Sequence, residues 1–147
     1  VDIEKLRALG MGSDGQFFDQ RFFFFFEETD FCRRIIEAGG RIVYQPLAHL
    51  MHLQGESANR RPVAARVQFQ ESRYKYFYKH EGAAAVAVLF VGTALRTLVN
   101  AVVQSLTAAL MFWRSRKYWD KAYVYWALLG WHLMLCRPRW SFDQRPR

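Results

Sequence analysis

The spacing of apolar residues predicts helices, one buried stretch and two short extended pieces in the first part of the chain. Apolar side chains three and four positions apart favour helices over residues 2–9 and 28–38, and a pair of glycines ends the second one. The phenylalanine-rich stretch 17–26 is too apolar for a surface loop, so it predicts a buried strand or a wall of the core. Residues 41–45 and 47–53 predict the extended pieces.

The second part of the chain predicts long helices. Residues 63–80 form a basic helix dense in aromatic residues, and Gly82 ends it. Residues 83–113 contain a single charged residue, Arg96, and residues 122–136 form a second apolar piece. Polar residues of the 83–113 helix recur at steps of four and three, which places them in one narrow stripe. They are Thr93, Thr97, Asn100, Gln104 and Thr107.

This stripe and Arg96 decide how residues 83–113 would meet a membrane. The apolar run before Arg96 has only 13 residues, too few to cross a bilayer. The entire segment would be about 46 Å long as a helix. However, an arginine near its midpoint costs roughly 2.5 to 3.5 kcal/mol on insertion scales. A helix that lies in the membrane plane avoids this cost.

Composition and charge sharpen the interpretation of the second part. The net charge is +8, but residues 1–57 are acidic and the rest is basic, unlike a uniformly basic nucleic-acid binder. All five tryptophans lie in the last third beside Lys and Arg, a mixture typical of a lipid headgroup boundary. The alternative is a pair of helices packed on the protein's own core or on a second subunit. Cys32 and Cys136 are too few and too far apart for a disulfide framework or a thiolate zinc site.

A cluster of carboxylates follows the phenylalanine run directly. Glu27, Glu28 and Asp30 come straight after Phe22–Phe26. An apolar wall beside clustered acids can hold a carboxylate partly desolvated, which suits proton transfer. Taken alone, however, acids at a helix start are ordinary capping charges. His52, taken alone, is equally an ordinary core or surface histidine.

The order of these pieces resembles the C-terminal half of family 2 glycosyltransferases. It reads Phe-Phe-Asp-x-x-Phe-Phe, Glu-acid-x-Asp, Arg, Gly, Ile-Val-Tyr, Pro46, and His52 six residues later. The resemblance covers residues 1–82 and is strongest to the rhamnosyltransferase-like branch of bacterial surface polysaccharide synthesis. It implies an α/β fold, the C-terminal half of a GT-A domain, followed by long apolar or amphipathic membrane-associated helices.

The resemblance also implies roles for four side chains. Glu28 would be the general base that takes a proton from an acceptor hydroxyl in a single inverting displacement. Glu27 and Asp30 would support the acceptor and the base. His52 would help to hold a divalent metal, Mg²⁺ or Mn²⁺, on the diphosphate leaving group, together with an Asp-x-Asp motif.

Two departures from the family pattern limit this expectation. The base position is usually Asp, and the longer Glu28 side chain moves the carboxylate by about 1.5 Å. A displacement of that size can cost about 100-fold in rate. No Asp-x-Asp occurs in the chain, so we expect the nucleotide-sugar half of such an enzyme to be missing from it. We therefore expect a fragment that shows no sugar transfer alone.

These features predict three regions and a set of partners. Residues 1–57 would carry the acceptor and base site, residues 58–82 a linking helix, and residues 83–147 the membrane-associated helices. The expected partners are a nucleotide-sugar donor, a saccharide or polyprenyl-linked acceptor and an anionic membrane, at the cytoplasmic face of a bacterial inner membrane, without nucleic acid.

Three other interpretations compete with this one. The first is a non-catalytic membrane-binding or subunit-contact module with a decayed site. The second is a metal hydrolase using Glu28, Asp30, His49 and His52, but the two histidines would point to opposite faces of a strand. The third is nucleic-acid binding through residues 58–80, which lack a recognisable motif.

Overall fold

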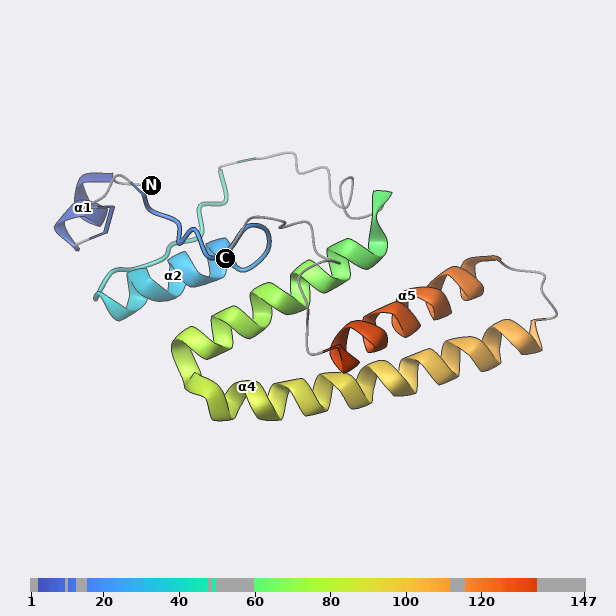
Figure 1. Cartoon of the computed structure of the whole chain (residues 1–147). Helices are drawn as coiled ribbons and strands as arrows, with labels where there is room; N and C mark the ends of the chain where they lie inside the picture. The colour runs from blue at the N-terminus through green and yellow to red at the C-terminus, as the bar shows by residue number, and fades with distance from the viewer. Residues whose placement is uncertain are drawn as a thin grey trace. The chain divides into compact units, whose positions relative to one another are not determined.

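The structure is a computed structural model in which the described residues are 3–9, 11–12, 16–47, 49, 60–111 and 116–134. They form four helices (Figure 1): α1 (Ile3–Ala8), α2 (Glu27–Glu37), α4 (Pro62–Leu110) and α5 (Arg116–Leu133). The contacts divide the chain into two units, Val1–Gln54 and Gly55–Arg147.

The predicted α/β fold, a partial GT-A domain, is wrong for the part of the chain that the structure describes. That part contains helices and irregular segments but no strand. Residues 41–45 are irregular, and Val43 and Tyr44 are 81% and 86% exposed. A strand exists only where a neighbouring strand accepts and donates its backbone hydrogen bonds. The described residues supply no such neighbour, so β propensity alone does not make a strand here.

The first unit confirms the two short helices predicted from the spacing of apolar residues. Helix α2 ends in a Schellman motif, as the glycine pair predicts. Gly39 has φ 81° and donates its N–H to the carbonyl of Ile36 at 3.0 Å, and the N–H of Gly40 reaches the carbonyl of Ile35 at 2.8 Å. The phenylalanine run, in contrast, contains bends and no strand, so the first of the two predicted forms of residues 17–26, a buried strand, is wrong. As for the second, a wall of the core, Phe22 is buried but Phe18 and Phe23 are about half exposed.

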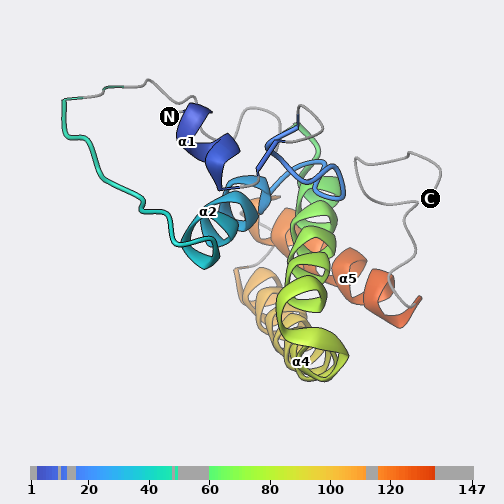
Figure 2. The same cartoon turned by 90° about the vertical axis from the view of Figure 1, so that its left-hand side faces the viewer.

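The second unit is built on a long helix that breaks at Gly82. Gly82 has φ 84° and ψ −178°, a conformation that side-chain-bearing residues avoid, and it divides α4 into two arms. We call residues 62–81 the N-arm and residues 83–110 the C-arm. Figures 1 and 2 show that the chain reverses at this break, so the arms run back along each other. The predicted helix end at Gly82 is therefore confirmed.

Helix α5 packs against both arms. On the N-arm side, the Tyr74 ring stacks on Trp131 at 6.4 Å between centroids. On the C-arm side, the indole N–H of Trp126 donates to the hydroxyl of Ser105 at 3.0 Å. A small apolar core of Val67, Leu128 and Trp131 lies between the N-arm and α5. The second unit is thus a three-helix bundle.

The C-arm turns its small and polar residues toward the bundle and its large apolar residues outward. Thr93, Thr97, Ala101 and Ala108 are buried. Small residues at such positions let helix backbones approach closely. The large exposed hydrophobic residues of the C-arm are all aliphatic. They are Val88, Val91, Leu95, Leu98, Val99, Val102, Val103, Leu106 and Leu110.

The burial of individual residues corrects part of the sequence interpretation. The predicted polar stripe exists, but Thr93 and Thr97 lie inside the bundle. Trp131, assigned above to a lipid boundary, is 1% exposed and belongs to the protein core, whereas Trp119 and Trp126 are exposed. Among the described helices, α4 is long and apolar enough to cross a membrane.

A buried histidine connects the N-arm with α5. Nδ1 of His132 lies 2.8 Å from the carbonyl oxygen of Leu128, which can only accept, so Nδ1 carries the hydrogen. Nε2 then accepts from the hydroxyl of Tyr74 at 2.9 Å. Burial lowers the pKa of His132; the hydrogen bond to the Leu128 carbonyl raises it less, and nearby Arg73 lowers it further. The folded bundle therefore favours the neutral imidazole.

We predict opposite effects for alanine at two glycines of α4. A Cβ at Gly82 or at Gly92 would meet no atom within 4 Å, so only the backbone conformation distinguishes them. Gly82→Ala should lower the free energy of unfolding by about 1–3 kcal/mol through backbone strain. Gly92→Ala, inside the helical C-arm, should raise it by up to about 1 kcal/mol. Denaturant titration followed by helical circular dichroism measures both, and equal effects would contradict the kink described here.

We predict that the bundle loses stability as the pH falls from 7.5 to 5.5. Because folding lowers the pKa of His132, the unfolded chain binds its proton first, so acidification favours unfolding. One such group gives a slope of at most about 1.4 kcal/mol per pH unit. Denaturant titrations across this range should show the slope in the native chain and lose it in His132→Gln. His80→Gln is the control and should keep the slope; a slope that persists in His132→Gln would refute the assignment.

Candidate active site

Two strained phenylalanines fix the start of α2, which carries the predicted site. Phe25 and Phe26 have φ of 67° and 68°, in the left-handed region that residues with side chains avoid. Phe26 is the N-cap residue and makes no side-chain capping bond. Such conformations cost about 1–3 kcal/mol each and persist only where surrounding contacts impose them. They turn the chain sharply, so the acids follow at once on the first turn of α2.

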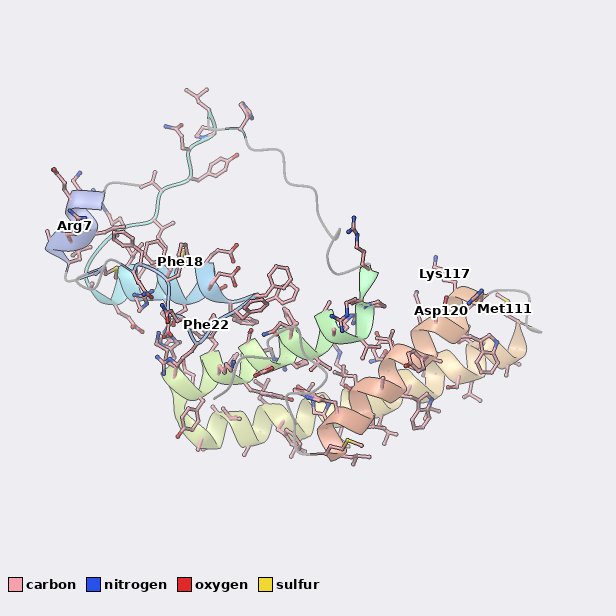
Figure 3. The ribbon with its side chains drawn as sticks, turned by 45° about the horizontal axis from the view of Figure 1, so that its top comes forward. Arg7, Phe18, Phe22, Met111, Lys117 and Asp120 are labelled. Atoms are coloured by element: carbon pink, nitrogen blue, oxygen red, sulfur yellow. The ribbon has the colours of Figure 1, made fainter. Side chains whose placement is uncertain are left out.

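Asp30 and Arg34 form a buried clamp that holds this turn. Asp30 is fully buried, and Nε of Arg34 donates to its Oδ2 at 2.9 Å. Nη2 of Arg34 also donates to the carbonyl of Phe17, which ties the segment before the phenylalanine run to α2. The neighbouring Phe18 ring packs on Phe31 of α2 at 5.1 Å between centroids, and Figure 3 labels Phe18 beside this helix. Asp30 therefore holds the local structure together.

Glu27 and Glu28 are in different surroundings. Glu28 is exposed, on the first turn of α2. Glu27 is partly buried, and its Oε2 is inaccessible to solvent and has no hydrogen-bond partner among the described residues. A buried carboxylate oxygen without a donor is costly. Of the pair, Glu28 is therefore the carboxylate that is accessible as an acceptor of protons.

The predicted metal ligand lies outside the described residues. That ligand is His52, so its distance from Glu28 is not defined. The other candidate histidine, His49, is described and exposed. Among the described residues, no three His, Cys, Asp or Glu side chains gather closely enough to hold a metal. Asp30, one of the acids considered for a metal hydrolase, already neutralises Arg34. The described carboxylates by themselves do not fit a metal site.

Two features of this site were missed in the sequence. The Asp30–Arg34 pair has the i, i+4 spacing of a helical ion pair, which was a usable signal. Its burial, and the second bond of Arg34 to Phe17, depend on contacts that spacing does not encode. The left-handed conformation of Phe25 and Phe26 had no signal, because glycine or asparagine is the usual residue there.

Comparisons with known proteins give no relative for this chain. No family model, no curated protein and no solved structure matches it.

We predict that Asp30→Asn loosens the start of α2. Arg34 would lose its charged partner while three quarters of its side chain stays buried. Breaking a fully buried pair costs about 3–5 kcal/mol; with Arg34 partly in water we expect about 2 kcal/mol. Amide hydrogen exchange in the first turn of α2 should accelerate accordingly.

The matched control is Glu37→Gln on the same helix. It breaks the exposed pair with Arg33, which has a 2.7 Å contact, and should cost less than about 1 kcal/mol. If both substitutions changed exchange equally, the clamp would have no special role.

Proposed function

We propose that the chain is the acceptor-side, membrane-associated part of an inverting glycosyltransferase similar to family 2, with Glu28 as its base. The observation that carries the proposal is the position of Glu28. Its exposed carboxylate follows two strained residues and sits on a helix turn held by the Asp30–Arg34 clamp. Strained backbone of this kind is concentrated at functional sites.

The proposed reaction needs one proton acceptor at this position. As the oxygen of an acceptor hydroxyl bonds to the anomeric carbon of the donor sugar, its proton passes to the Glu28 carboxylate. The bond between that carbon and the nucleoside diphosphate breaks, and its electron pair leaves with the diphosphate. A sugar hydroxyl is a poor nucleophile unless a base removes its proton, which typically contributes 10²- to 10⁴-fold in rate.

Glu27 and Asp30 would have different tasks in this reaction. Glu27 is partly buried beside the base and would support the acceptor through the part of its side chain that stays open to solvent. Asp30 would support the base indirectly, by holding the first turn of α2 in place, because its carboxylate is paired with Arg34. A divalent metal, held by His52 and an Asp-x-Asp motif from upstream, would neutralise the leaving diphosphate.

The expected location follows from the same proposal and from α4. Lipid-linked acceptors would place the site beside a membrane, and the exposed aliphatic face of the C-arm gives the chain a surface for one. We propose the cytoplasmic face of a bacterial inner membrane, with a saccharide or a polyprenyl-linked saccharide as acceptor.

The second candidate is a non-catalytic membrane-binding or subunit-contact module. The observation that favours it is the same aliphatic face, which serves adhesion without any chemistry at Glu28. A decayed site is also consistent with a glutamate where the family usually has aspartate.

We predict that Glu28→Gln lowers sugar transfer by 10²- to 10⁴-fold while donor binding is kept. The substitution should be made in the full-length protein, together with any sequence that precedes Val1, and assayed with radiolabelled nucleotide-hexoses and nucleotide-deoxyhexoses. Glu28→Asp should keep part of the activity, because it keeps a carboxylate. Glu37→Gln, the same change at the other end of α2, should have no effect. Unchanged transfer in Glu28→Gln would favour the non-catalytic module.

A further inference from the structure

The three-helix bundle presents an unusual distribution of polarity. In a bundle surrounded by water, apolar side chains point inward and polar ones outward. The C-arm does the reverse: Thr93 and Thr97 are 6% and 4% exposed, whereas Leu95 and Leu106 are each 59% exposed. Polar and small residues inside, with aliphatic residues outside, is the pattern of helices whose surroundings are hydrocarbon.

The chemistry of the outward face favours lipid over a second protein. The large exposed hydrophobic residues from Val88 to Leu110 are all valine or leucine. Protein interfaces depend on tryptophan, tyrosine and arginine, while leucine and valine are under-represented among their anchors. The face extends about 33 Å along the helix, so it offers a continuous aliphatic strip.

A basic and aromatic cluster lies at the end of this strip. Figure 3 labels Met111, at the end of α4, near Lys117 and Asp120 of α5. Arg116, Lys117 and Lys121 are exposed there, and Asp120 is the one acid of α5. Exposed Trp119 and Trp126 lie seven residues apart, on one side of the same helix. Tryptophan beside lysine and arginine suits the headgroup region of an anionic membrane.

The N-arm determines the orientation of the bundle. It lies along the C-arm, where Nη2 of Arg73 donates to the hydroxyl of Thr93 at 2.7 Å and the Tyr74 and Phe90 rings are 6.0 Å apart. The N-arm is rich in charged residues. They are Arg66, Glu71, Arg73, Lys75, Lys79 and Glu81. If the C-arm crossed the bilayer, these charges would be drawn toward hydrocarbon, at roughly 2.5 to 3.5 kcal/mol for each one that reaches the centre.

Arg96 supports the same orientation. It is exposed and comes directly after Leu95, which lies near the middle of the aliphatic strip. One residue corresponds to a rotation of about 100° about the helix axis, so Arg96 lies at the border of the strip. At the border of the strip, its long side chain can reach the headgroups of a membrane that covers the strip. In a membrane-spanning helix, Arg96 would lie deep in the bilayer.

We propose that the three-helix bundle lies flat on an anionic phospholipid bilayer, with the aliphatic strip of the C-arm buried among the acyl chains. The helix that is long enough to cross a membrane therefore does not cross it. The inference rests on the membrane association in the proposed function and is independent of the chemistry at Glu28.

Depth measurements along the strip test the orientation. In the full chain with Cys32→Ser and Cys136→Ser, single cysteines at Val88, Leu95, Val102 and Leu106 would carry spin labels. These positions lie on one line of the helix and span about 27 Å. With vesicles of phosphatidylcholine containing phosphatidylglycerol, a flat bundle predicts the same shallow depth at all four positions.

The other outcomes overturn the proposal. Depth that is greatest at Leu95 and Val102 and falls toward both ends would show a membrane-spanning helix. Labels that stay in water would exclude immersion. Labels that broaden one another's spectra between molecules, without immersion, would identify a second copy as the occupant. None of these results depends on sugar transfer, so this proposal and the role of Glu28 can fail separately.

Binding measurements provide a second test with a matched control. Leu95→Ser together with Val102→Ser should weaken co-sedimentation with the same vesicles by about tenfold or more per residue, because each loses aliphatic burial. Val43→Ser together with Leu47→Ser, at positions that are 81% and 84% exposed in the first unit, should leave binding unchanged. Equal losses in both pairs would mean that the strip has no special part in binding.

Discussion

The backbone conformation of Gly82 is the constraint on which the second unit depends. A continuous α4 would be a rod with a charged aromatic end and an aliphatic end, and neither could pack on the other. The break turns the C-arm back along the N-arm, so that Arg73 reaches Thr93 and Tyr74 reaches Phe90. Once the arms are antiparallel, α5 can contact both of them. Glycine is needed because residues with a Cβ avoid this backbone conformation.

The direction of this fold-back also decides which side of the C-arm is covered. Thr93 of the polar stripe bonds to Arg73 of the N-arm, and Ser105 of the C-arm accepts from Trp126 of α5, so the aliphatic side is left outside. The same packing brings His132 against the Tyr74 hydroxyl and buries Trp131 beside them. The polar contacts inside the bundle and the apolar surface outside it are therefore two consequences of one arrangement.

The first unit is organised by a different interaction, the ion pair between Asp30 and Arg34. Because Arg34 also holds the carbonyl of Phe17, one side chain connects the segment before the phenylalanine run with the helix after it. The acids that follow the run thus differ in their surroundings: Asp30 is buried and paired with Arg34, while Glu28 is accessible.

Local signals in the sequence predicted the helices well and the sheet poorly. The apolar spacing gave α1 and α2, the glycine pair gave the Schellman motif, and Gly82 marked the break in α4. These features depend on residues within a few positions of each other, so sequence contains their cause. The strand predicted at residues 41–45 needed a neighbouring strand, and propensity could not supply one. The site was predicted in part: the acids do stand on the first turn of α2, but the sequence did not separate the buried Asp30 from the exposed Glu28.

By itself, the sequence determined α1 and α2, the break of α4 at Gly82, the polar stripe of the C-arm and the position of the acids after the phenylalanine run. Only the tertiary structure decided that Thr93 and Thr97 lie inside and the leucines and valines outside, that Trp131 belongs to the core, and that Arg34 neutralises Asp30. Helical periodicity fixes which residues share a face, but which face is buried depends on the partner that packs against it.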